Sequence, residues 1–214
     1  MRFSKVFGIG LPRTGTTSLN IALNTIGVSS IHFPFSLYES LDSKIISQYT
    51  GFVDSPLSYL YQKLDIKYPG SGFILTTRPI EAWLKSMNWL LNEGRCIWEW
   101  QSSYDSYHEE FFGSANFETS LYRNKYYQFH SEVSNYFQGR NDLLILDLSA
   151  AYGYEELCNF LDLPVCNKEY PCGNETRKPR QLQRIAKQVG EYNKSYEQFI
   201  RRLDYYIVKF RKLM

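Results

Sequence analysis

Residues 6–19 read VFGIGLPRTGTTSL, and this stretch decides the fold. The short apolar run from Lys5 to Ile9 predicts a buried strand. A turn with two glycines and a proline follows it, and a helix is predicted from Thr16 to Leu23, ending at Gly27. A strand, a glycine turn and a helix start in this order indicate a place where the backbone can bind an anion.

The physical basis of that site is the helix N-terminus. Backbone N–H groups in the first turn of a helix lack partners and carry the positive end of the helix dipole, so they attract phosphate. Gly10 and Gly15 let a ligand approach the backbone closely, and Thr16 and Thr17 offer hydroxyl donors. The alternative is an ordinary glycine-containing turn between a strand and a helix.

The spacing from Gly10 to Gly15 is that of a Walker A loop, but the lysine expected after the second glycine is Thr16. That lysine normally reaches the β- and γ-phosphates, so its absence argues against an ATP or GTP site. The nearest cation is Arg13. Residues 12–17, Pro-Arg-Thr-Gly-Thr-Thr, resemble the 5′-phosphosulfate loop of sulfotransferases that use 3′-phosphoadenylyl sulfate (PAPS). Through this resemblance Arg13 and the segment from Thr14 to Thr17 are expected to bind the donor.

Length and composition favour one globular domain over residues 1–214, with 43% hydrophobic and 21% charged residues. No run of 18 apolar residues exists, and the first strand begins too early for a signal segment, so a cytoplasmic protein is expected. The four cysteines show no paired CxxC spacing and are expected to be free thiols. A net charge of +2 says nothing about partners, and no nucleic-acid partner is expected.

Strands and helices alternate through the rest of the chain. The expected strands are Ser29–Phe33, Gly51–Asp54, Phe73–Thr77 and Asp142–Asp147. The expected helices are Leu37–Gln48, Pro56–Lys67, one that starts at Pro79, and Tyr154–Leu161, with residues 94–139 mostly helical. This alternation predicts an α/β fold, a three-layer P-loop-type parallel sheet flanked by helices. Ligands of such sheets bind outside the carboxyl ends of the strands, so Gly10, Asp54 and Arg78 should share one crevice.

A second anion site is predicted where the strand Phe73–Thr77 ends. Arg78 follows this strand, and Ser86 lies eight residues later on the next helix. In sulfotransferases an arginine and a serine at this spacing bind the 3′-phosphate of PAPS, and a guanidinium matches phosphate geometry well. The alternative is that Arg78 caps a surface helix and Ser86 is solvated.

Two residues are candidates for the catalytic base. Asp54 ends a predicted strand, with Pro56 two residues later, where cytosolic sulfotransferases carry a catalytic histidine. An exposed aspartate is a weak base, so this role requires burial or apolar surroundings to raise the pKa of Asp54. The alternative is a structural aspartate that caps the next helix. His32, at the end of the neighbouring strand, is the second candidate, although a lone histidine is more often structural.

The second half of the chain is similar to one branch of the P-loop sulfotransferase family. The similarity lies in the segment Leu143–Leu148, the helix Tyr154–Leu161 and the later Pro164, Tyr170-Pro171 and Asn174. In this family a loop after the helix closes over the 3′-phosphate and the adenine. By resemblance, Arg177 and Lys178 are the cations of that loop.

Residues 180–214 predict a long amphipathic helix, because apolar residues recur at steps of three and four from Leu182 to Leu213. Packing against the chain's own sheet is the favoured interpretation. A homodimer formed through this helix is the alternative, and the helix's many basic residues are expected to face solvent.

Together these features predict a sulfotransferase that moves a sulfuryl group from PAPS to a hydroxyl or amine of a small acceptor and releases adenosine 3′,5′-bisphosphate. Asp54 or His32 would take the acceptor's proton, and Arg13 would stabilise the developing charge. No metal is expected. The alternatives are a P-loop kinase of a small molecule and an inactive nucleotide-binding or interaction protein.

Overall fold

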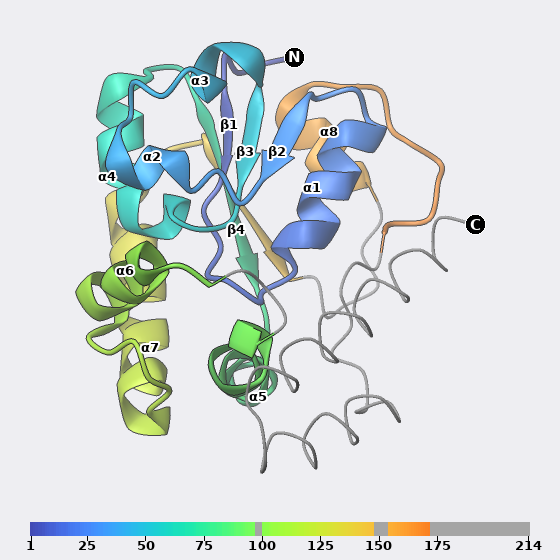
Figure 1. Ribbon diagram of the computed structural model, residues 1–214. Helices are drawn as coiled ribbons and strands as arrows, with labels where there is room; N and C mark the ends of the chain where they lie inside the picture. Colours follow the sequence, from blue (N-terminus) through green and yellow to red (C-terminus); the bar gives the residue numbers. More distant parts are fainter. Residues whose placement is uncertain (97–99, 148–153, 172–214) are drawn as a thin grey trace. The chain divides into compact units, whose positions relative to one another are not determined.

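The fold is built on five parallel strands, seen in a computed structural model that describes residues 1–96, 100–147 and 154–171 (Figure 1). The strands are β1 (Val6–Gly8), β2 (Ser30–His32), β3 (Gly51–Val53), β4 (Gly72–Thr77) and β5 (Leu143–Asp147). Their order across the sheet is β2-β3-β1-β4-β5, and every neighbouring pair is parallel. The predicted α/β class with a parallel sheet is confirmed.

The helices occupy the stretches between the strands. They are α1 (Thr16–Thr25), α2 (Ser36–Glu39), α3 (Ile45–Gln48), α4 (Leu57–Lys67), α5 (Ile80–Asn92), α6 (Ser102–Phe112), α7 (Thr119–Tyr136) and α8 (Glu155–Leu161), with a 3₁₀ turn at Gly94–Cys96. No helix in the described ranges is long and apolar enough to cross a membrane.

The single helix expected over Leu37–Gln48 is wrong, because α2 and α3 are separate short helices. Between them the amide of Asp42 donates to Ser40 Oγ at 3.2 Å, and the amide of Ser43 donates to the Ser40 carbonyl at 3.2 Å. Side-chain oxygens that accept nearby amide hydrogens compete with the helical ladder, and here they turn the chain.

By its internal contacts the chain divides into two compact units. The first comprises residues 1–84 and 119–174 and holds the whole sheet, and the second comprises residues 85–118 and 175–214. The expected single domain over residues 1–214 stays a prediction. The expected helix over 180–214, and a dimer through it, lie outside the described residues.

One face of the sheet is aliphatic. Val6, Val53 and Ile74 point from three adjacent strands into a cluster with Leu19 and Leu23 of α1. The apolar side of α8 joins the same cluster through Leu157, Cys158 and Leu161. Helices α1 and α8 therefore form one layer on this face of the sheet (Figure 1).

The opposite face is aromatic. The Phe7 ring lies 5.6 Å from both Phe52 and Phe73, and Phe73 lies 5.0 Å from Phe137, which follows α7. Tyr61 of α4 packs edge-on against Phe129 of α7 at 6.1 Å. Successive residues of a strand point to opposite faces of the sheet, so Val6 packs into the aliphatic core and Phe7 into the aromatic one. Much of the chain's 17% aromatic content serves this packing.

Candidate active site

The loop after β1 starts with a tight turn over residues 11–14. The amide of Thr14 donates to the Leu11 carbonyl at 3.2 Å, and Arg13 has a positive φ of 71°. Proline at the second position and a left-handed residue at the third match a type II turn, where glycine is usual at the third. An arginine held in this conformation costs about 1 kcal/mol, and such strain gathers at functional sites.

Helix α1 begins directly after this turn. Gly15, at φ 101°, is its N-cap residue, and no side chain among the described residues caps the helix. A φ of this size suits glycine, which has no Cβ to clash. The first turn, with Thr16 and Thr17, thus provides the positive end of the helix dipole that the sequence predicted.

Thr14 is tied to the neighbouring strand. Its hydroxyl donates to the Leu11 carbonyl at 2.6 Å, and its oxygen lies 2.6 Å from Thr76 Oγ1 of β4. Both threonines are buried. The Thr14 amide and hydroxyl therefore shape the loop, and a direct contact of Thr14 with the donor stays a prediction.

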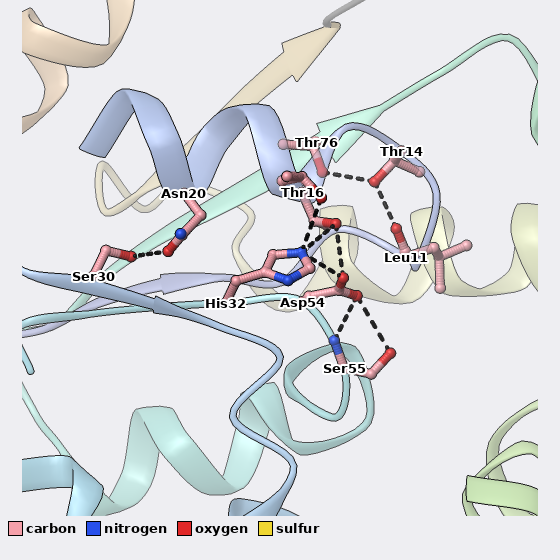
Figure 2. Close-up of polar contacts among 10 residues, drawn as sticks. Leu11, Thr14, Thr16, Asn20, Ser30, His32, Asp54, Ser55 and Thr76 are labelled. Carbon is pink, nitrogen blue, oxygen red and sulfur yellow. Dashed lines mark hydrogen bonds and ion pairs between the residues drawn. The ribbon is translucent and has the colours of Figure 1, made fainter. Parts of the chain in front are cut away.

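His32 and Asp54 lie in direct polar contact at the carboxyl ends of two adjacent strands (Figure 2). His32 Nε2 lies 2.9 Å from Asp54 Oδ2. The strand register explains the contact, because His32 of β2 is opposite Val53 of β3, and Asp54 follows Val53. Asp54 lies just beyond the end of β3, at φ 86°, and is not its last residue as predicted.

The first turn of α1 meets this pair. The Thr16 hydroxyl donates to Asp54 Oδ2 at 2.9 Å, and the hydroxyls of Thr16 and Thr17 lie 3.4 and 3.3 Å from His32 Nε2. The Ser55 amide donates to Asp54 Oδ1 at 2.7 Å. The candidate base and the candidate anion loop therefore form one site (Figure 2).

The condition for Asp54 to act as the base, a raised pKa, is not met. Burial does act in that direction, but the charge and hydrogen bond of His32 outweigh it, together with hydrogen bonds from Ser55 and Thr16. The net result is a pKa below the ordinary value of an aspartate. Asp54 is therefore a stable carboxylate, and its strength as a base is low.

Two arginines converge on the same edge of the sheet. Arg78, just after β4, donates from Nη1 to the carbonyl of Arg13 at 3.3 Å. Burial lowers the pKa of the Arg13 guanidinium, the charge of Asp54 raises it, and the charge of Arg78 lowers it again. This effect of Arg78 on the pKa of Arg13 means that the two positive charges repel each other. Such a pair of cations suits a ligand with several negative charges.

Three further residues fix the site loops and were not predicted as site residues. Trp83 donates to the Pro12 carbonyl at 2.8 Å, Tyr126 donates to the Arg78 carbonyl at 2.7 Å, and Thr76 contacts Thr14. Trp83 is fully buried on α5, so a pattern of apolar residues gives no sign of its polar contact. A buried tryptophan usually finds a partner for its N–H, which is the one signal the sequence offered.

Other predicted site residues are less closely tied to this cluster. Ser86 is buried on α5, but it belongs to the second compact unit, so a site shared with Arg78 stays a prediction. Arg177 and Lys178 lie outside the described residues. In the described part of the chain, no three or more His, Cys, Asp or Glu side chains gather as a metal site would require. Cys158 and Cys166 are free thiols, as expected.

Known proteins resemble this chain in sequence and in fold. "Ava biosynthesis cluster protein M" of Aspergillus versicolor is 26% identical over 208 residues, which cover 78% of this chain and 79% of that protein. The crystal structure of a sulfotransferase from Alicyclobacillus acidocaldarius has the same fold at 16% identity. Its TM-score is 0.50, and the match covers 94% of this chain and 97% of that one.

The family assignment rests on a longer match. Residues 5–44 and 36–178 fit the family described as "Sulfotransferase domain". This match spans well over half of the chain and includes the loop after β1, the His32–Asp54 pair and Arg78. The chain therefore belongs to the sulfotransferase domain family.

Proposed function

We propose that this protein transfers a sulfuryl group from PAPS to a hydroxyl or amine of a small acceptor. The observation that carries the proposal is the meeting of Arg13, Arg78 and the His32–Asp54 pair at the carboxyl ends of adjacent strands. Two cations and a candidate base in one place suit the transfer of an anionic group. Membership of the sulfotransferase domain family supports the same reaction class.

The residues of the cluster suit the donor's two phosphate ends. The first turn of α1 and Arg13 would hold the 5′-phosphosulfate, and Arg78 with Ser86 would hold the 3′-phosphate, with Arg177 and Lys178 completing that end. A helix terminus contributes only about 0.3–2 kcal/mol to anion binding, whereas micromolar affinity requires about 8 kcal/mol. The second anchor at Arg78 is therefore needed. When bound, the donor supplies the activated sulfuryl group.

His32 is the proton acceptor in this proposal, and Asp54 is its positioning residue. The low pKa of Asp54 keeps it ionised, and a neutral His32 with its proton on Nε2 would donate to Asp54 Oδ2, 2.9 Å away. In that tautomer the Nδ1 atom of His32 carries the lone pair that takes the acceptor's proton. The imidazolium that results is stabilised by the adjacent carboxylate, so the proton leaves the acceptor as its oxygen or nitrogen attacks.

Arg13 stabilises the charge that develops during transfer. Arg13 lies three residues before the start of α1, in a left-handed conformation, and this position supports the proposed role. Groups that are oriented before the reaction need no reorganisation as charge develops, and this makes such stabilisation effective.

The proposal is tested by calorimetric titration with adenosine 3′,5′-bisphosphate and, separately, with ATP and Mg²⁺. Wild type should bind the bisphosphate at micromolar concentration, and Arg78→Ala should weaken this binding by tenfold or more. Arg123→Ala is the matched control, because Arg123 of α7 forms an ion pair with Glu81 of α5 at 2.6 Å. The control variant should bind as wild type does.

The other outcomes separate the alternatives. If the protein binds ATP with Mg²⁺ but does not bind the bisphosphate, the sulfotransferase proposal is wrong and a kinase is favoured. Binding of neither ligand would favour an inactive interaction protein. If the bisphosphate binds as expected, labelled PAPS offered with panels of hydroxyl and amine compounds identifies the acceptor class.

A further inference from the structure

Two buried aromatic residues hold the two arginine loops. Trp83 of α5 donates from Nε1 to the Pro12 carbonyl at 2.8 Å, and Tyr126 of α7 donates its hydroxyl to the Arg78 carbonyl at 2.7 Å. Their rings pack against each other with centroids 5.0 Å apart. Trp83 is fully buried, and Tyr126 is 9% exposed. We call Trp83 and Tyr126 the aromatic clamp.

Each contact acts directly beside an arginine. The Pro12 carbonyl belongs to the peptide that precedes Arg13. Because a trans peptide is planar, with C=O and N–H in opposite directions, the hydrogen bond to Trp83 orients the Arg13 amide away from Trp83. Tyr126 fixes the carbonyl of Arg78 itself. A buried carbonyl that loses its donor costs about 1–3 kcal/mol, so both contacts resist movement of the loops.

The clamp also opposes a repulsion. The charge of Arg78 lowers the pKa of the Arg13 guanidinium, so the two cations disfavour each other at their present separation. Without a restraint, the loops would relieve this repulsion by moving apart. The hydrogen bond from Arg78 Nη1 to the Arg13 carbonyl, at 3.3 Å, completes a connected network of Trp83, Tyr126 and the two loops.

We propose that the aromatic clamp sets the separation of the two anion loops and thereby selects ligands that carry two phosphate groups. The inference rests on the proposed function, because it takes Arg13 and Arg78 to bind opposite ends of one donor. A ligand with one phosphate uses one loop and is insensitive to the separation. A ligand with two phosphates needs both loops at the right distance. Trp83 and Tyr126 are therefore positioning and specificity-determining residues.

The test compares two ligands on variants that remove one donor atom. Tyr126→Phe keeps the ring and loses the hydroxyl, and Trp83→Phe removes the indole N–H. The matched control is Tyr136→Phe on the same helix, whose hydroxyl donates to Asp65 Oδ2 at 2.8 Å, away from the arginine loops. The ligands are adenosine 3′,5′-bisphosphate, titrated directly, and adenosine 5′-monophosphate, measured by competition against it.

Tyr126→Phe should raise the Kd for the bisphosphate by about threefold to tenfold, as expected for one lost hydrogen bond. The Kd of this variant for the monophosphate should stay within about twofold of the wild-type value, because the lost hydrogen bond acts on the Arg78 loop and the monophosphate uses the Arg13 loop. Trp83→Phe acts on the Arg13 loop, which both ligands use, so it should weaken the binding of both. Tyr136→Phe should change neither ligand's affinity.

Two results would overturn the clamp alone. Equal weakening of both ligands in Tyr126→Phe would mean a general structural role, and unchanged affinity for both would mean that the hydroxyl does not position the loop. In either case wild type still binds the bisphosphate, so the proposed function survives. A wild type that fails to bind the bisphosphate overturns the proposed function, and the clamp with it.

Discussion

The side-chain oxygen of Thr14 lies 2.6 Å from that of Thr76, and this contact joins the loop after β1 to the end of β4. Thr76 lies two residues before Arg78, so the same strand end supports both anion loops. Both threonines are buried. A Cβ on Gly10 would overlap Thr76 Oγ1 and would lie 2.9 Å from the Thr76 carbonyl oxygen.

Gly10→Ala should therefore destabilise the protein. Overpacking of a tight site costs about 1–3 kcal/mol, and the Thr76 carbonyl is backbone and cannot rotate away. The free energy of unfolding in urea measures the loss. Combining Gly10→Ala with Thr76→Ala removes one of the clashing atoms, so the double variant should be more stable than the sum of the single effects predicts. Strict additivity would show that the two residues do not compete for space.

Arg13→Gly should separate stability from ligand binding. Glycine accepts the left-handed conformation at φ 71°, so this variant should be about 1 kcal/mol more stable than Arg13→Ala, which keeps the strain. Both variants lack the guanidinium and should bind adenosine 3′,5′-bisphosphate at least tenfold more weakly than wild type. Urea unfolding and calorimetry give the two quantities. Equal stability of the glycine and alanine variants would contradict a strained Arg13.

The division of roles between His32 and Asp54 predicts unequal losses of activity. His32→Gln should lower kcat for sulfuryl transfer by about 10²–10⁴-fold, the usual contribution of a general base. Asp54→Asn removes the charge that orients and stabilises the imidazolium and should cost less. The Kd for the bisphosphate should change little in His32→Gln. A larger loss of kcat in Asp54→Asn than in His32→Gln would assign the base to the carboxylate instead.

His108 predicts a dependence of stability on pH. Burial lowers its pKa to about 4, the charge of Arg95 acts in the same direction, and the charge of Asp105 opposes them. Between pH 6.5 and 4 the unfolded chain binds a proton that the folded chain does not. Stability is therefore full above pH 6.5 and falls by up to about 3 kcal/mol as the pH drops to 4.

The variant that isolates this effect is His108→Phe. The His108 ring stacks on Phe112 with centroids 5.1 Å apart, and a phenyl ring can preserve that packing. Urea unfolding at several pH values should give a flatter profile for the variant between pH 6.5 and 4. Parallel profiles for variant and wild type would show that His108 is protonated in the folded protein.

The sequence was sufficient for the sheet because most of the strands are short apolar runs bounded by turn residues. It also placed Gly10, Asp54 and Arg78 at one edge, since the carboxyl ends of parallel strands coincide. The contact of His32 with Asp54 was not predictable, because it depends on β2 lying next to β3, and no local pattern specifies strand order. The low pKa of Asp54 follows from that contact and was missed for the same reason.

The supporting contacts were hidden for a different reason. Trp83 and Tyr126 belong to apolar helix faces, and periodicity reveals which residues are buried but not which carbonyl a buried N–H or O–H meets. The left-handed conformation of Arg13 was equally invisible, since glycine is the residue that normally signals it. The break between α2 and α3 had a local cause, a serine-rich turn that the apolar pattern outweighed.

The strand order has a consequence for when the site comes into being during folding. Thr14 and Thr76 are 62 residues apart in the chain, and Arg13 and Arg78 are 65 residues apart. Each contact between the two loops therefore closes a long segment of the chain. Such contacts form late, because their closure entropy must be met before they contribute. A nascent chain that ends before β4 holds Arg13, His32 and Asp54 but lacks the strand that supports them. The contacts that join the Arg13 and Arg78 loops therefore require β4 to pair with β1.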